Sequence, residues 1–369
     1  MKKLTILLLS ALLLLASCAP SLNDEEEVLQ NDEDSKVETS IVPGNRLDDN
    51  TYRMILPYRT SEARGVIVDQ IANRVDIDEM EEGLRRHSTE VFDPKNLYFQ
   101  EGRYLSGETV IGWIDEFNPN RQDEWSREQH ESNPRIFSHV LEQNYFLKQK
   151  EGNTVELAGI SIGIALKSVY RFKADGTDYS YDISMDEMLS KGYEVAENIV
   201  QEMREMEGLA DVPILVSLYR EESQASPVPG NYVTKTVVPG GSNAVGNWES
   251  IDEEYILFPS NEANEKYLED YEVFNSFGNE IAKFFPNYVG AIGEGFYING
   301  ELNQLTIEVP IEFYGKAEVI GFSQFANDLV QDTFPNYYDL EINITSSNNM
   351  EALIYRNAKE EQPTIHIFH

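Results

Sequence analysis

Cysteine and histidine are scarce in this sequence. One cysteine and five histidines occur in 369 residues. A lone cysteine excludes an intrachain disulfide framework, and no H-E-x-x-H pattern supplies a pair of zinc ligands. Gly290, Gly293 and Gly295 do not form a dinucleotide fingerprint, and no glycine-rich stretch ends in the Lys-Ser or Lys-Thr of a phosphate loop. We therefore expect no metal and no cofactor.

Basic residues are also few. Lysine and arginine together number 29 against 65 aspartates and glutamates, which gives a formal charge of −36. A chain this acidic repels nucleic acid and anionic lipid head groups, so neither is expected as a partner. Hydrophobic residues make up 41% of the sequence, enough for one large or two medium domains with their own cores.

The longest apolar run lies at the N-terminus and is too short to cross a membrane. Lys2 and Lys3 precede an apolar stretch from Leu4 to Leu15, whereas a spanning helix needs about 20 apolar residues. The run ends in a lipobox, which consists of Leu15, Ala16, Ser17 and Cys18. Residues 1–17 are therefore predicted to be a lipoprotein signal peptide, cleaved between Ser17 and Cys18. A diacylglyceryl group on Cys18 would then anchor the mature chain in the membrane.

Residues 18–44 change sharply in composition. Carboxylates dominate this stretch, and Lys36 is its one basic residue. Such a run is typical of a disordered, self-repelling tether, which we predict here; a cation-binding segment is the alternative.

The folded part is predicted to be α+β, with antiparallel sheets covered by helices. Asp76 and Glu79 form a predicted capping box for an early helix, and a second helix is expected at residues 108–117. Two later stretches each show a strand, a hairpin, a strand, a helix and a strand, at residues 160–218 and 299–344. We therefore predict two related modules at residues 45–258 and 259–369.

A segment rich in serine, proline and glycine separates these two stretches, at residues 221–248. Long loops in compact chains are often functional. Exposed aromatic and amide side chains suit sugars and peptides, so the predicted ligand-binding residues are Tyr232, Asn243, Asn247 and Trp248. The alternative is a hairpin that packs Trp248 inward.

Residues 159–163 read Gly-Ile-Ser-Ile-Gly and match the nucleophile elbow of serine hydrolases. The strand pattern runs straight through the motif, and no glycine-rich oxyanion motif precedes it. Ser161 is therefore interpreted as a serine on the polar face of a strand, and no catalytic residue is predicted.

Several motifs together resemble one known family. They are the lipobox and acidic stretch, Ile55-Leu56-Pro57-Tyr58 through Ala63-Arg64-Gly65, Val75-Asp76-Ile77-Asp78 with Glu82-Gly83-Leu84, Tyr98-Phe99-Gln100-Glu101-Gly102, and Gly159 to Gly163. The combination resembles the CamS family of lipoproteins of Gram-positive bacteria, described as sex pheromone precursors. The resemblance implies release of the signal peptide by signal peptidase II and trimming by a membrane protease to a short apolar pheromone. By that analogy the candidate pheromone consists of Ala11, Leu12, Leu13, Leu14, Leu15, Ala16 and Ser17.

The expected function is thus that of a lipid-anchored protein on the extracellular face of the cell membrane. Its folded part is predicted to bind an unidentified extracytoplasmic ligand or wall component without catalysis. The alternative is a surface hydrolase that acts on wall glycan or peptide, with acidic residues in the cleft between the modules. A purely structural or adhesive role is the third possibility.

Overall fold

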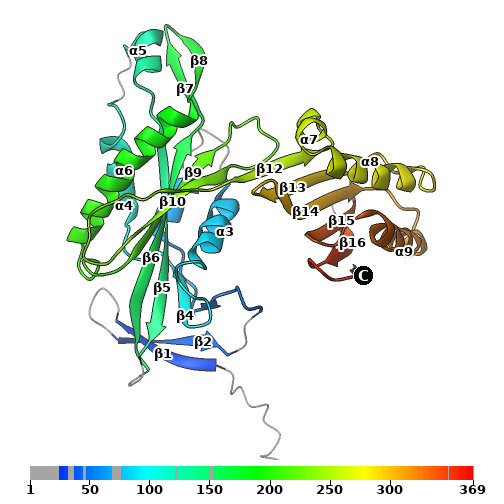
Figure 1. Ribbon diagram of the computed structural model, residues 1–369, viewed down its shortest axis with the longest axis horizontal. Coiled ribbons are helices and arrows are strands. Elements are labelled where there is room, and N and C mark those ends of the chain that lie inside the picture. Colours follow the sequence, from blue (N-terminus) through cyan, green and yellow to red (C-terminus); the bar gives the residue numbers. More distant parts are fainter. Residues whose placement is uncertain are drawn as a thin grey trace, which may run out of the picture.

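The computed structural model describes residues 25–31, 37–44, 47–68, 76–120, 124–149, 153–347 and 349–368. The predicted signal peptide, Cys18 and the candidate pheromone Ala11 to Ser17 lie outside the described residues. The described chain forms two modules, each built on its own large sheet (Figure 1).

The first module contains a seven-stranded sheet. In spatial order its strands are β11 (Glu249–Ser250), β10 (Asn231–Val238), β9 (Ile214–Glu221), β6 (Val155–Lys167), β5 (Phe137–Lys148), β4 (Leu97–Glu101) and β3 (Arg53–Met54). Neighbouring strands are antiparallel except for the β6–β9 and β3–β4 pairs, which are parallel.

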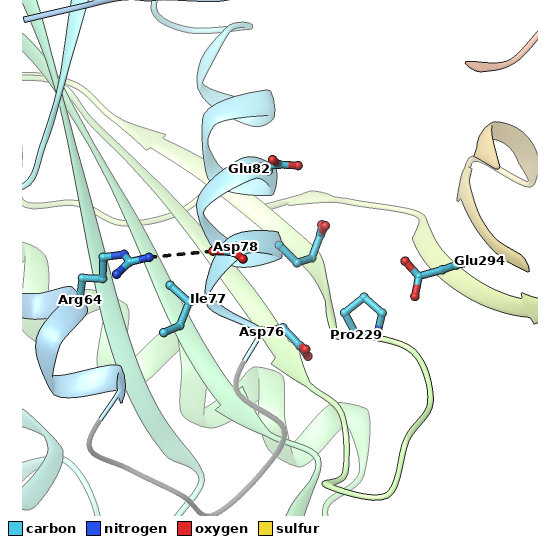
Figure 2. A pocket seen from close by; sticks show the side chains of 8 residues that line it. Arg64, Asp76, Ile77, Asp78, Glu82, Pro229 and Glu294 are labelled. Carbon is cyan, nitrogen blue, oxygen red and sulfur yellow. Dashed lines mark ion pairs between the residues drawn. The ribbon is translucent and has the colours of Figure 1, made fainter. Parts of the chain in front are cut away.

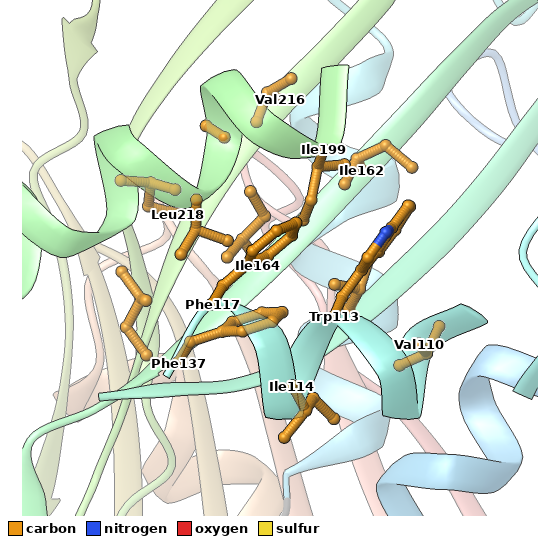
Figure 3. Packing of buried hydrophobic residues seen from close by; sticks show 14 of the residues in the cluster. Val110, Trp113, Ile114, Phe117, Phe137, Ile162, Ile164, Ile199, Val216 and Leu218 are labelled. Carbon is orange, nitrogen blue, oxygen red and sulfur yellow. The ribbon is translucent and has the colours of Figure 1, made fainter. Parts of the chain in front are cut away.

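Helices cover both faces of this sheet. The helices of the module are α2 (Glu62–Val68), α3 (Ile77–Ser88), α4 (Gly107–Glu116), α5 (Arg127–Ser132) and α6 (Met185–Glu205). On one face α4 and α6 enclose the main core, where Trp113 and Ile199 meet Ile162 and Ile164 of β6 (Figure 3). The other face packs against α3 through Met80 and Leu84.

The second module contains a six-stranded sheet with helices on one face. In spatial order its strands are β12 (Glu253–Phe258), β13 (Ile292–Ile298), β14 (Glu301–Pro310), β15 (Asp339–Ser346), β16 (Asn349–Arg356) and β17 (Thr364–Ile367). Its helices are α7 (Asn261–Lys266), α8 (Leu268–Ala282) and α9 (Lys316–Thr333). Only the β14–β15 pair is parallel in this sheet.

The two sheets repeat one topology. Strands β4, β5, β6, β9, β10 and β11 follow the same order and relative directions as β12 to β17. In both modules two helices follow the first of these strands, and one helix, α6 or α9, crosses between the parallel pair. The predicted α+β class and the two related modules are therefore confirmed. The hairpin of β7 (Val169–Ala174) and β8 (Thr177–Asp182) differs from the prediction, because it forms a separate two-stranded sheet.

The predicted module boundary after residue 258 is wrong. Strand β12, which ends at Phe258, pairs with β13 along its whole length and so belongs to the second sheet. The boundary lies between Ser250 of β11 and Glu253 of β12. An alternating apolar pattern predicts a strand, but it does not say which sheet that strand joins.

The predicted disorder of residues 18–44 is wrong for two segments. Strands β1 (Glu25–Asn31) and β2 (Val37–Pro43) pair in antiparallel fashion. Val28 and Val42 are fully buried and share a small core with residues of the first sheet. The few apolar side chains among the carboxylates thus find partners that are distant in sequence.

Steric constraints explain the Gly-Ile-Ser-Ile-Gly motif. A Cβ at Gly159 would lie 2.0 Å from the Phe92 ring, and one at Gly163 would lie 2.6 Å from the Tyr232 hydroxyl. The glycines therefore allow close packing on this face of the sheet. Ser161 is buried, not on a polar face as predicted, and its hydroxyl lies 2.7 Å from that of Ser88.

Gly159→Ala is expected to destabilise the fold by about 2–3 kcal/mol, because the added methyl group overpacks the Phe92 ring. Urea unfolding measures the change. The control is Gly112→Ala on α4, where nothing lies within 4 Å of the added Cβ and a gain of about 0.5–1 kcal/mol is expected. Equal stabilities of the Gly159 variant and the wild type would contradict the packing role.

Candidate functional site

Tyr232 is wrong as a predicted ligand-binding residue. The predicted loop contains β10, and Tyr232 lies on this strand with 0% of its surface exposed. Its hydroxyl donates to the Met80 carbonyl at 2.9 Å, and its ring meets that of Tyr219 edge-on at 5.1 Å. The flanking prolines and glycines indicated a loop, but the residues between them form a strand that pairs with β9.

The other three predicted ligand-binding residues do not converge on a shared cavity. Trp248 is half-buried and packs on Tyr193 of α6, with 4.7 Å between ring centroids, as the inward-packing alternative expects. Asn243 and Asn247 are exposed, and Asn247 has a φ of 54°, a left-handed turn conformation that asparagine tolerates. None of these residues lines the cleft described next.

A cleft lies between α3 of the first module and the sheet of the second. One cavity has a volume of about 460 Å³ (Figure 2), and an adjacent cavity has a volume of about 230 Å³. The two cavities share Glu79, Glu82 and Glu294, so they are adjacent, and we call them together the inter-module cleft.

Carboxylates dominate the walls of this cleft. Helix α3 and the residue before it contribute Asp76, Asp78, Glu79 and Glu82, and β13 contributes Glu294. Asp76 does not form the predicted capping box; its carboxylate accepts a hydrogen bond from the Gly230 backbone N–H at 3.2 Å.

Both arginines of the cleft are engaged with carboxylates. Arg64 lies 3.9 Å from Asp78 and is also hydrogen-bonded to Glu81 of α3. Arg86 donates to Glu253, and its guanidinium lies 4.5 Å from the centroid of the Phe296 ring. The cleft therefore presents an excess of negative charge.

Glu253 connects the two modules. Its side chain is 3% exposed, and it accepts hydrogen bonds from Arg86 Nη2 at 3.0 Å and Nε at 3.3 Å. His87 Nε2 lies 3.2 Å from the same carboxylate. Burial disfavours the charge, but these neighbours hold the pKa of Glu253 below its ordinary value. No local sequence pattern predicts this ion pair, because its partners are 167 positions apart.

Glu79 sits at the centre of the cleft, and burial raises its pKa from 4.5 to about 7. A hydrogen bond from Tyr255 and the charge of Arg86, 3.6 Å away, oppose this rise. Glu253 and Glu82 increase it. Glu79 therefore exchanges a proton near neutral pH.

Motif residues of the first module support one wall of the cleft. The Tyr58 hydroxyl donates to Glu101 Oε1 at 2.5 Å, and the Ser61 backbone N–H donates to Oε2 at 2.6 Å. Arg64 Nε lies 3.7 Å from the same Glu101. These contacts connect Arg64, at the edge of the cleft, to the end of β4.

Neither a metal-binding cluster nor a membrane-spanning helix is found among the described residues. No group of three or more His, Cys, Asp or Glu side chains among them is placed to hold a metal ion. Within the same residues, no helix is long and apolar enough to cross a membrane.

Glu253→Ala is expected to weaken the contact between the modules, because it leaves Arg86 and His87 without their shared partner. Removing one partner of a fully buried pair costs roughly 3–5 kcal/mol, and we expect about 2 kcal/mol here because Arg86 is partly exposed. Urea unfolding followed separately in each module measures the effect. The control is Glu262→Ala, which removes an exposed partner of Lys266; matching effects of the two variants would contradict the linking role.

Glu79→Gln is expected to remove a pH dependence of stability. A carboxyl whose folded pKa is raised stabilises the fold fully below its unfolded pKa of 4.5, and this contribution is lost as the pH rises through about 7. Between pH 5 and pH 8, the melting temperature of the wild type should fall by more than that of Glu79→Gln. Identical pH profiles would contradict the assignment.

The comparisons with known proteins agree with this architecture. The family model of the CamS sex pheromone cAM373 precursor matches residues 58–362. A crystal structure of a sex pheromone precursor from Lactobacillus salivarius subsp. salivarius UCC118 is similar, with 25% identity and a TM-score of 0.81. The match covers 88% of this chain and 98% of that one. The C-terminal domain of the sex pheromone staph-cAM373 precursor from Staphylococcus aureus is 26% identical, with a TM-score of 0.67.

That second match covers 79% of this chain and 96% of the Staphylococcus aureus domain. No curated protein matches the sequence. The family model spans well over half of the residues, including every strand from β4 to β16. The chain belongs to the CamS family of sex pheromone precursors.

Proposed function

We propose that the chain has two roles, one for each product of cleavage before Cys18. The released signal peptide supplies a short apolar pheromone, Ala11 to Ser17. The mature part is anchored through lipidated Cys18 on the extracellular face of the membrane, where it binds an extracytoplasmic ligand or wall component. Membership of the CamS family and the lipobox support the first role.

The inter-module cleft is the observation that supports the binding role. Its larger cavity, about 460 Å³, falls within the size range of ligand pockets. Its walls come from both modules, which is a common location for binding sites. Binding there would increase contact between the modules, so the ligand should raise the stability of the protein without turnover.

A surface hydrolase is the second candidate function, and Glu79 favours it. A carboxyl with a pKa of about 7 is suited to general acid or base catalysis at neutral pH. Hydrolysis of wall glycan or peptide would release products, and Glu79→Gln would abolish that release. Stabilisation by wall fragments without product would favour binding, and neither response would favour a structural role.

The pheromone role is tested by mass spectrometry of spent culture medium from the native host. The peptide Ala-Leu-Leu-Leu-Leu-Ala-Ser is expected from the wild type, because cleavage before Cys18 gives it a free carboxyl end. Cys18→Ala should abolish the peptide, because the lipobox loses the residue that receives the lipid. Absence of the peptide from wild-type medium would overturn this role and leave the binding role standing.

A further inference from the structure

The second module exposes a sheet face whose counterpart in the first module is covered. In the first module α3 packs on the face of β5, β6, β9 and β10 that lies opposite α4 and α6. The equivalent face of the second sheet lies opposite α8 and α9. Helix α3 reaches the edge of this face, where the Arg86 guanidinium lies over the Phe296 ring. Beyond that edge, side chains such as Glu308 and Tyr355 are exposed.

Strand register places polar side chains in two rows across this open face. Glu294 pairs with Thr306, Thr306 with Glu341, and Glu341 with Tyr355. Glu308 and Asn343 form a parallel row two residues further along the strands. With neighbouring strands about 4.8 Å apart, the first row extends roughly 14 Å.

Asn343 fixes two of these carboxylates. Its side chain is largely buried, and Nδ2 donates to Glu308 Oε1 at 2.8 Å and to Glu341 Oε1 at 3.0 Å. The amide holds both carboxylates on the open face without neutralising them, because it carries no charge. The face therefore keeps its negative charge in a fixed arrangement.

The open face adjoins the inter-module cleft, and we call the two together the acidic groove. Glu294 belongs to both, and the α3 wall adds the four carboxylates of the cleft. Such a surface complements a positively charged partner. The carboxylates are spread along the groove, and none of the described residues forms a cluster suited to a metal ion. A partner with several separated positive charges fits this spacing better than a single ion.

The structure also indicates the shape of that partner. On the first module, α3 shows that this face of the repeated sheet accepts an elongated segment lying across its strands. Tyr355 is 39% exposed on the open face, where its ring can receive a lysine or arginine side chain through a cation–π contact.

We propose that the acidic groove binds a basic polypeptide segment across β13 to β16, in the position that α3 occupies on the first sheet. This inference rests on the proposed binding role of the cleft and names the class of its ligand. Lysine or arginine side chains would contact Glu294, Glu308 and Glu341. Tyr355 would hold one of them over its ring.

The affinity should also depend on pH through Glu79, whose charged form attracts the ligand. The groups that face Glu79 are Glu82 and Arg86 on α3, Tyr255 and Glu253 on β12, Glu294 on β13, Tyr232 on β10 and Tyr219 on β9. Because its pKa is about 7, Glu79 is mostly protonated at pH 6 and mostly charged at pH 8. Binding of a basic peptide should therefore tighten over this interval.

The test is fluorescence anisotropy of the purified full chain with a labelled peptide of alternating lysine and alanine. The matched probe replaces lysine with glutamine and should not bind. The triple variant Glu294→Gln, Glu308→Gln and Glu341→Gln should weaken binding about tenfold, because each exposed ion pair contributes about two- to threefold. Added salt should weaken wild-type binding as well.

The control variant removes the same charge elsewhere. Glu197→Gln, Glu205→Gln and Glu207→Gln lie on or just after α6, at exposed positions outside the groove. Unchanged affinity in this control variant supports binding in the groove. An equal loss of affinity in both triple variants would show an effect of net charge alone and would overturn the proposed site. Glu308→Lys provides a second check at an exposed position and should weaken binding further than Glu308→Gln.

The remaining outcomes distinguish failure of the proposed ligand class from failure of the proposed binding role. Wall glycan that stabilises the protein while the lysine peptide fails to bind would overturn the ligand class and keep the binding role. If calcium or magnesium at equimolar concentration stabilises the chain and displaces the peptide, the ligand is a metal ion and the proposed peptide ligand is overturned. If no probe binds or stabilises the protein, both proposals fail.

Discussion

The packing of α3 between the two modules is the constraint on which the rest of the structure depends. One side of this helix lies so close to the first sheet that a Cβ at Gly83 would be 2.8 Å from the Tyr232 ring. One turn further along the helix, Arg86 and His87 contact Glu253 at the start of the second sheet. Because the same helix carries Glu79 and Glu82, the contacts that hold the modules together also position the walls of the cleft.

The repeated topology gives two sheets of the same design and different surroundings. In the first, both faces are buried, and glycine, serine and alanine on β6 make room for α3. In the second, the corresponding positions on β14 are Thr306 and Glu308, which no helix of the described chain covers. A sheet face that will be buried by a helix needs small or apolar side chains, because unpaired buried charge is costly. The charged face of the second sheet is therefore suited to contact with solvent or a polar partner.

Local patterns in the sequence predicted the elements well and their partners poorly. The helix predicted at residues 108–117 is α4, and the Ser106 hydroxyl accepts from the Thr109 N–H at its start. The alternation through Ile160 to Leu166 likewise became β6. Tyr232, by contrast, was predicted to be exposed, although its hydroxyl bonds to Met80, 152 positions away. The burial of a side chain and the sheet that a strand joins depend on such distant contacts, which hydrophobic periodicity does not encode.

The proposed lipid anchor restricts how the cleft is presented on the cell surface. Strand β1 begins seven residues after Cys18, so the intervening chain spans at most about 25 Å even when fully extended. The hairpin of β1 and β2 packs on the first module through Val28 and Val42. A lipid on Cys18 would therefore hold this end of the first sheet near the membrane. Anionic lipids would be repelled by the groove, whereas a basic segment near the same surface would be attracted to it.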